Sequence, residues 1–366
     1  FLMKTESKRT SELQEFYKDK KVYITGITGF KGTWLALLLK ELGAKVFGVG
    51  LLPEKGSLAE KVHLDELVDV VYCDITADAN NSPYLNTMAH FRPDVVFHLA
   101  AQALVSVGYD DPFTTFNTNI MGTVITHEII KGLDKKVSLV NVTTDKVYQE
   151  KTAPATESDV LRGYDPYSLS KSCSDMISLC YKDCFESNGS LISVSTMRGG
   201  NVLGGGDYSE NRIIPDIVRA SISNEILKLR NPESVRPYQH VLDVLLAYIT
   251  VGMKQYDDKD LAGTYNVGPS FEGGVVTKDL VSEMNKVIPF QFEVDKNTSI
   301  GHENPLLQLD SSLIREKTDW TPIYDNYNEV IKETATWYSN VDIKDINSAL
   351  DETLTQIRKG LSLYGN

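Results

Sequence analysis

The chain has 366 residues, of which 42% are hydrophobic and 24% are charged, as in an ordinary soluble globular protein. This length suffices for one large domain or two unequal ones. The formal net charge of −13, with no basic cluster to offset it, argues against a nucleic-acid-binding surface. Apolar runs such as residues 34–39 are too short to span a membrane, and the first residues do not resemble a signal peptide. We therefore expect a cytoplasmic protein with neither a membrane nor a nucleic-acid partner.

The first half of the chain alternates β-rich runs with helical patterns. This alternation predicts an α/β fold with a Rossmann-type, doubly wound parallel sheet. The expected strands are residues 21–25, 45–49, 69–72, 94–98, 137–142 and 191–196. The clearest expected helices are residues 31–42, 118–132 and 167–187. In the first of them, Trp34, Leu35, Leu38 and Leu39 recur at helical spacing.

The alternation ends near residue 196, where Gly-rich turns, an Arg-Pro-rich strand and several helices follow. We expect residues 1–196 to form the first domain. Residues 197–340 are expected to form a smaller C-terminal α/β lobe at the carboxyl edge of the sheet, where such sheets bind ligands. A later segment near residues 234–262 is expected to complete the sheet, and residues 341–366 to form a C-terminal helix.

The four cysteines are Cys73, Cys173, Cys180 and Cys184. No histidine or carboxylate stands beside them at ligand spacing, so we predict no metal site. Reduced thiols are the expected state of these side chains in a cytosolic protein.

Three glycines, Gly26, Gly29 and Gly32, follow the first strand and open the first helix. Glycines there permit a tight turn and a close backbone approach to a pyrophosphate, and the helix start offers free N–H groups to it. Three glycines in a loop can also be no more than a turn. Their place between strand and helix favours a dinucleotide site, so residues 1–196 are expected to hold a nicotinamide cofactor.

The choice between NAD and NADP depends on the end of the second strand, here residues 48–54. The usual acidic residue is absent, Glu54 lies slightly beyond its place, and no arginine is present to hold a 2′-phosphate. We therefore predict NAD. Asp74 and Ile75, after the third strand, are candidates for holding the adenine, although Asp74 can also simply cap a turn.

Tyr167 and Lys171 are four residues apart at the start of a helix, so they share a face. A free phenol has a pKa of about 10, which is too high for a base at neutral pH. A neighbouring ammonium and the positive nicotinamide ring favour phenolate, and we expect them to lower the pKa of Tyr167 by about three units. Tyr167 is then predicted to take the hydroxyl proton of an alcohol that is being oxidised.

Thr144, Asp145 and Lys146 come directly after the fifth strand, at the same edge of the sheet. Thr144 can hydrogen-bond the hydroxyl that is oxidised. Oxidation of a sugar at C4 makes the C5 hydrogen acidic, so Lys146 as base and Asp145 as acid would eliminate water across C5 and C6. The alternative is a turn at a strand end with surface charges.

These motifs resemble those of the extended short-chain dehydrogenase/reductase superfamily, and within it those of the CDP-glucose 4,6-dehydratases. The similarity runs from about residue 21 to residue 338. It rests on GITGFKGTWL (26–35), HLAAQ (98–102), TNIMGT (118–123), NVTTDK (141–146), GYDPYSLSK (163–171), GGNVLGGGD (199–207), NRIIPD (211–216), LRNPESVRPYQHVLD (229–243) and HENPLLQLD (302–310). Lysine at position 146 is the feature that best distinguishes this resemblance, because the related dTDP- and GDP-sugar dehydratases have glutamate at that position.

The resemblance implies conversion of CDP-glucose to CDP-4-keto-6-deoxyglucose, a step of deoxysugar biosynthesis. It implies a catalytic set of Thr144, Asp145, Lys146, Tyr167 and Lys171. The implied cofactor residues, besides Tyr167 and Lys171, are Gly26, Thr28, Gly29, Phe30, Lys31, Gly32, Asp74, Ile75, Leu99, Ala100, Ala101 and Asn119. The implied substrate residues are Gln102, Asn201, Arg212, Arg236, His240 and His302, with Arg236 suited to a diphosphate. It also implies a homodimer, in which residues 118–132 and 167–187 of two subunits form a four-helix interface.

The chain departs from the family pattern at three places. Ile27 replaces a histidine of the glycine turn, and Leu52 replaces an aspartate after the second strand. The loop between residues 148 and 164 is shorter and lacks the family's tryptophan-rich stretch. Because that loop borders the active site, these departures bear more on the identity of the nucleotide-sugar than on the chemistry.

Two other functions fit the same fold. A nucleotide-sugar epimerase or 4-keto reductase needs no elimination acid and base, so Asp145 and Lys146 argue against it. An inactive Rossmann protein that senses a cofactor or bridges partners needs no catalytic pair, so Tyr167 and Lys171 argue against it.

Overall fold

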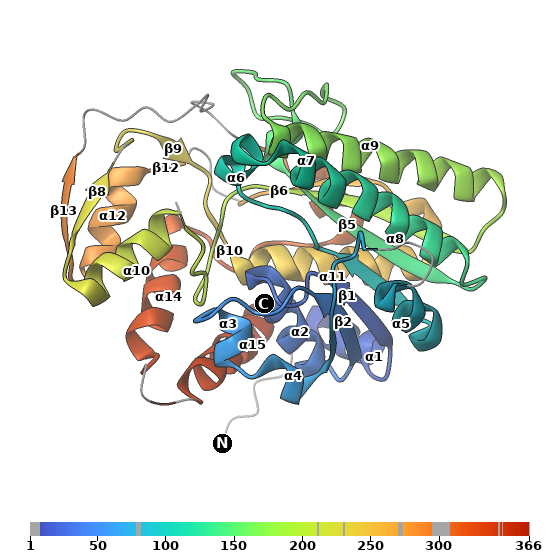
Figure 1. The fold of residues 1–366 in the computed structure, drawn as a ribbon, viewed down its shortest axis with the longest axis horizontal. Helices are drawn as coiled ribbons and strands as arrows, with labels where there is room; N and C mark the ends of the chain where they lie inside the picture. Colours follow the sequence, from blue (N-terminus) through green and yellow to red (C-terminus); the bar gives the residue numbers. More distant parts are fainter. Residues whose placement is uncertain are drawn as a thin grey trace.

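The computed structural model describes residues 8–77, 82–210, 212–229, 231–269, 274–294, 308–342, 345 and 347–365. Its centre is a seven-stranded parallel sheet of strand order β11-β6-β5-β4-β1-β2-β3 (Figure 1). The strands are β1 (Lys21–Thr25), β2 (Lys45–Gly50), β3 (Asp69–Tyr72), β4 (Val95–His98), β5 (Val137–Thr144), β6 (Ile192–Gly199) and β11 (Thr264–Val267). The order reverses at β1 and β4, which is where doubly wound sheets bind their ligands. The predicted α/β fold is confirmed.

Helices cover both faces of the sheet, because β1, β4 and β5 are buried along nearly their whole length and need apolar cover on each side. One face carries α1 (Lys8–Tyr17), α2 (Phe30–Glu41), α11 (Val241–Asp257), α13 (Ser312–Thr318) and α15 (Ser348–Leu363). The other face carries α5 (Pro83–Phe91), α8 (Gly122–Lys131) and α9 (Pro166–Ser187). Short helices in the connections are α3 (Leu58–Lys61), α4 (Leu64–Leu67), α6 (Val105–Asp110), α7 (Pro112–Phe116), η1 (Asn117–Met121), η2 (Asp145–Val147) and η3 (Lys259–Leu261).

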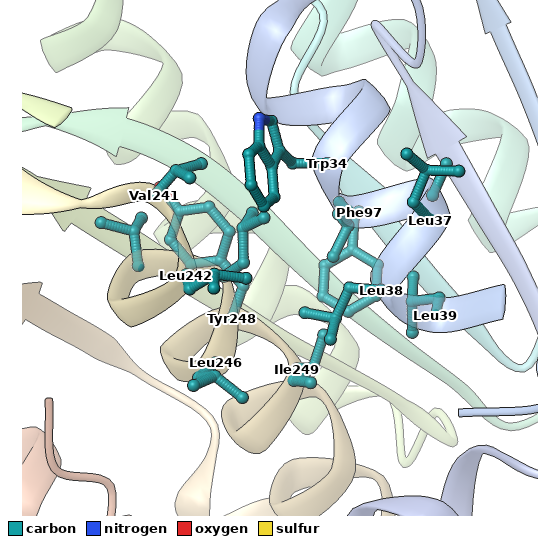
Figure 2. Close-up of a cluster of buried hydrophobic side chains, with 14 of the residues drawn as sticks. Trp34, Leu37, Leu38, Leu39, Phe97, Val241, Leu242, Leu246, Tyr248 and Ile249 are labelled. Atoms are coloured by element: carbon teal, nitrogen blue, oxygen red, sulfur yellow. The ribbon is translucent and has the colours of Figure 1, made fainter. Parts of the chain in front are cut away.

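The largest core lies between α2 and α11. Figure 2 shows Trp34 and Leu38 of α2 beside Leu242, Tyr248 and other side chains of α11. Burying each such side chain contributes about 1.5–3 kcal/mol. This contact fixes the start of α2, and with it the glycine turn, against the rest of the domain.

Two expected elements differ from the structure. Residues 234–262 were expected to complete the sheet, but their apolar run forms the buried helix α11, and the completing strand β11 begins just beyond, at Thr264. The helix expected over residues 118–132 begins as the π-helical turn η1 before α8. The C-terminal helix, expected over residues 341–366, is α15. No helix in the described ranges is long and apolar enough to cross a membrane.

The smaller lobe has its own apolar core. It contains α10 (Ile213–Ser223), α12 (Thr277–Asn285), α14 (Tyr327–Asn340) and the parallel pair β8 (Ile226–Leu229) and β13 (Gln291–Val294). Two short ladders, β7 (Val202–Leu203) with β10 (Gln239–His240) and β9 (Val235–Arg236) with β12 (Val275–Val276), lie between lobe and sheet. Because α11 and β11 return to the sheet, the lobe is built from the parts of residues 197–340 that lie before and after them.

Candidate active site

The glycine turn is built so that only glycine fits at two positions. Gly26 has a φ of +71°, and a Cβ there would lie 2.7 Å from the Ala100 nitrogen. A Cβ on Gly32 would lie 2.1 Å from the Gly26 carbonyl oxygen. Gly29 is the N-cap of α2 and has no side chain with which to cap it, so the N–H groups of the first helical turn are suited to an anionic ligand. This arrangement fits the pyrophosphate of a dinucleotide.

The strand ends beside the turn hold it in place. Thr28 donates its hydroxyl to the Leu51 carbonyl at 2.9 Å, and the Ala100 N–H donates to the Thr25 hydroxyl at 3.2 Å. Leu99 donates its N–H to the Thr25 carbonyl, which aligns the end of β4 with the end of β1. Thr28 and Phe30 therefore lie at the turn and Leu99, Ala100 and Ala101 follow the neighbouring strand β4, and their role in cofactor binding stays a prediction.

Three of the other implied ligand residues make internal bonds. The Asp74 carboxylate accepts bonds from the N–H and the hydroxyl of Thr76, both at 2.8 Å, which is the turn-capping alternative; Ile75 beside it is buried. Asn119 is buried, accepts a bond from the Gln102 N–H and donates to the Ser170 hydroxyl at 2.7 Å. The Gln102 amide bonds Leu104 and Thr115 in turn. Their role as ligands stays a prediction; in the structure, Asn119 of η1 links Gln102 to Ser170 of α9.

Helix α9 presents both residues of the Tyr-x-x-x-Lys pair. Asp165 caps it by accepting a bond from the Ser168 N–H at 2.9 Å, and Pro166 occupies its first position. The Lys171 ammonium donates to the Val142 carbonyl at 2.9 Å. Burial, with repulsion from Lys31, lowers the pKa of Lys171 to about 7 despite the attraction of Asp175.

The pKa of Tyr167 differs from our expectation. Burial raises it to about 12, although hydrogen bonding with Thr144 and the charge of Arg212 act to lower it. We expected a pKa below 10, lowered by the Lys171 ammonium together with the positive nicotinamide ring. In the protein alone, desolvation of the phenolate outweighs the nearby cations.

The Thr-Asp-Lys segment forms the end of β5 and the 3₁₀ turn η2. The Thr144 hydroxyl donates to Asp145 Oδ1 at 2.9 Å and accepts from the Lys146 N–H at 3.4 Å. Asp145 is 3% exposed, and its Oδ2 has no hydrogen-bond partner among the residues that the structure describes. Lys146 is half-buried beside it. The structure thus brings together a tyrosine, a hydroxyl and a carboxyl group as expected.

A buried ion pair behind these residues was missed from the sequence. The Arg198 guanidinium donates to both oxygens of Asp175, at 2.7 and 2.9 Å, and also to the Tyr148 hydroxyl at 2.8 Å. Thr143 donates to the same carboxylate. The available signal was helical spacing, because Asp175 lies one turn after Lys171 on α9. The pair ties β6 and α9 to β5, directly behind Thr144.

Four of the six implied substrate residues differ in their positions. Arg212 lies near the catalytic residues, since its charge acts on both Tyr167 and Lys31, and it pairs with Asp207 at 3.3 Å. Asn201 directly precedes β7, and the buried Arg236 belongs to β9. His302 lies outside the described residues.

His240 has no exposed surface and caps α11 by accepting from the Leu242 N–H, with its ring against Tyr324 and Trp34. Burial lowers its pKa to about 3. The structure therefore assigns His240 to packing, whereas we expected it in the substrate pocket. The sequence held one signal for this packing role, because His240 directly precedes a long apolar run and does not adjoin a glycine turn.

Residues 23–334 match the family described as GDP-mannose 4,6 dehydratase. A CDP-glucose 4,6-dehydratase of Salmonella typhimurium is 35% identical over 345 residues, which cover 90% of this chain and 94% of the relative. A UDP-glucose 4-epimerase of Mycoplasma genitalium is 24% identical over 278 residues, which cover 71% of this chain and 78% of the relative.

Solved structures share the fold. A dTDP-glucose 4,6-dehydratase of Bacillus anthracis in complex with NAD has a TM-score of 0.71 and 24% identity, covering 87% of this chain and 96% of its own. A UDP-glucose 4-epimerase of Thermus thermophilus in complex with NAD has a TM-score of 0.74 and 22% identity, covering 88% of this chain and 99% of its own. The resemblance expected from the motifs is confirmed: the chain belongs to the family described as GDP-mannose 4,6 dehydratase.

Proposed function

We propose that the chain is an NAD-dependent nucleotide-sugar 4,6-dehydratase that converts CDP-glucose to CDP-4-keto-6-deoxyglucose and water. The observation that carries the proposal is the cluster of Thr144, Asp145 and Lys146 at the end of β5, beside Tyr167 and Lys171 of α9. The relative at 35% identity is named for CDP-glucose, and lysine at position 146 favours the same substrate by resemblance.

The glycine turn, the start of α2 and the end of β4 would hold the cofactor, because its phosphates need close backbone N–H donors. The chemistry that bound NAD supplies is hydride acceptance from C4 of the sugar and hydride return to C6. Lys171, whose pKa is lowered to about 7, donates to the Val142 carbonyl. This bond fixes the face of α9 that carries Tyr167 against β5. Arg212 and Arg236 supply positive charge for the substrate diphosphate.

The chain's own residues perform the proton steps. Tyr167 takes the C4 hydroxyl proton while the Thr144 hydroxyl orients that group. Lys146 removes the C5 proton, which the neighbouring C4 ketone has made acidic. Asp145 then protonates the C6 hydroxyl, which leaves as water. Oδ2 of Asp145, which has no hydrogen-bond partner among the described residues, is the oxygen available for this step.

The test is incubation of the purified enzyme with CDP-, dTDP-, GDP- and UDP-glucose and no added cofactor. The expected result is a 4-keto product, seen by its ultraviolet absorbance in alkali, with CDP-glucose preferred. Preference for another base would refute the nucleotide, and absence of product from all four would refute the dehydratase. Tyr167→Phe is the matched inactive control. The cytoplasmic location expected from the sequence stays a prediction.

A homodimer is the second part of the proposal. Helices α7 and α9 and the turn η1 pack together and expose large apolar side chains, including Phe113 at 80% and Met176 at 58%. Such side chains indicate a protein interface. Met176→Asp should dissociate the dimer in analytical ultracentrifugation, whereas Ile222→Asp, on the exposed side of α10, should not. A wild-type chain that sediments as a monomer would refute this part.

A further inference from the structure

The proposed reaction needs no net proton, yet it moves one proton between two side chains. Tyr167 gains the proton of the C4 hydroxyl, and Asp145 loses one to the departing water. Lys146 takes the C5 proton and returns it to C5, so its balance is zero. After each turnover Tyr167 therefore holds one proton too many and Asp145 one too few.

This proton must pass from Tyr167 to Asp145 before the next turnover. Two routes exist: exchange of both groups with solvent, or direct transfer through the protein. The free energy of the move is the same by either route, because it depends only on the end states. The route decides the rate, and burial slows exchange with solvent. Asp145 is nearly inaccessible.

One hydroxyl, that of Thr144, interacts with both groups. It donates to Asp145 Oδ1 at 2.9 Å, and hydrogen bonding with it also acts to lower the pKa of Tyr167. Asp145 Oδ2 has no partner in the described part of the chain, so one oxygen faces Thr144 while the other is left for the substrate. This division suits a carboxyl group that receives a proton on one oxygen and delivers it from the other after a half-turn about its Cβ–Cγ bond.

We propose that the Thr144 hydroxyl carries the proton from Tyr167 back to Asp145 after each turnover, an inference that rests on the proposed dehydratase function. The Tyr167 O–H bond breaks as a new O–H bond forms at Thr144 Oγ1. The original Thr144 O–H bond breaks as one forms at Asp145 Oδ1. The negative charge passes from the carboxylate to the phenolate, no group is oxidised or reduced, and the next substrate meets a base and an acid again.

The first test uses the wild-type holoenzyme, mixed in excess with CDP-glucose in weak buffer containing a pH-indicator dye. Internal return predicts 4-keto product with no proton signal in phase with it. Release and later uptake of about one proton per active site would overturn the relay and leave the dehydratase intact. Absence of 4-keto product would instead refute the proposed function, so the two failures are distinguishable.

The second test compares Thr144→Val, which keeps the shape and loses the hydroxyl, with Thr144→Ser, which keeps the hydroxyl. In Thr144→Val, turnovers after the first should be slower than the first by on the order of 10²-fold, the typical contribution of a positioned proton carrier. Imidazole, a diffusible proton carrier, should speed the later turnovers and not the first. Thr144→Ser should show no such difference between the first and the later turnovers. First and later turnovers slowed equally in Thr144→Val, without response to imidazole, would mean that Thr144 only orients the C4 hydroxyl.

Discussion

Replacing Lys171 by methionine should abolish activity and yet stabilise the fold. Burial holds the pKa of Lys171 at about 7, against 10.5 for a free lysine. At about 1.36 kcal/mol per pKa unit, keeping this group charged lowers the free energy of unfolding by about 5 kcal/mol at pH values below 7. Methionine removes that penalty but leaves the Val142 carbonyl without its donor, which costs about 1–3 kcal/mol. The expected net gain is about 2–4 kcal/mol.

The sign of the pH dependence provides the check. Between pH 7 and pH 10.5 the unfolded wild type holds the Lys171 proton and the folded wild type does not, so wild-type stability rises with pH. The advantage of Lys171→Met should therefore shrink by about 2–3 kcal/mol between about pH 6 and about pH 9. Urea denaturation of NAD-free proteins measures it, since bound NAD stabilises only the native chain.

Lys18→Met is the matched control, because Lys18 is exposed and its loss should change the stability by less than about 0.5 kcal/mol at either pH. Two results would refute the assignment of a buried ammonium that destabilises the fold. One is a Lys171→Met variant less stable than wild type, and the other is a variant whose gain in stability is the same at both pH values. It would then follow that solvent reaches Lys171 in the folded protein.

Three other changes test the site and its support. Lys146→Met should slow solvent exchange of the C5 hydrogen on the order of 10²-fold or more, with C4 oxidation still measurable in a single turnover; equal loss of both would mean that Lys146 is no dedicated base. Gly32→Ala puts a methyl group 2.1 Å from a carbonyl oxygen of the turn, so the purified protein should lose its NAD, whereas Gly263→Ala, with no atom within 4 Å, should keep it. NAD retained by Gly32→Ala would contradict the proposed cradle. Asp175→Asn leaves the buried Arg198 charge uncompensated and should lower the free energy of unfolding by about 3–5 kcal/mol in urea denaturation; a loss below about 1 kcal/mol would show that water solvates the pair.

The local elements were predictable because their signals lie within a few residues. The run 21–25 followed by Gly26, Gly29 and Gly32 predicted a strand, a turn and a helix start, and the structure contains all three. Thr144 to Lys146 and Tyr167 to Lys171 were recognisable as two sets at one edge of a parallel sheet. The family assignment from these motifs was right for the same reason.

The side chains with long-range partners were not predictable in this way. We expected His240 in the substrate pocket, but it lies in the core. Trp34 of α2 and Tyr324, just before α14, pack against its ring. The bonds that Asn119 makes to Gln102 and Ser170 also join segments far apart in the chain, while its role as a cofactor residue stays a prediction. Such partners are set by packing between segments far apart in the chain.

The amino-acid sequence was enough to assign the class of fold, the family and the candidate reacting groups, because spacing along one strand or helix fixes which side chains share an edge or a face. The charge states of those groups and the contacts between them depend on the tertiary structure. Burial raises the pKa of Tyr167 and lowers that of Lys171, and it leaves one oxygen of Asp145 bonded to Thr144 and the other without a partner in the described residues. Desolvation depends on every segment that surrounds a group, so it cannot be derived from the residues beside that group in the sequence.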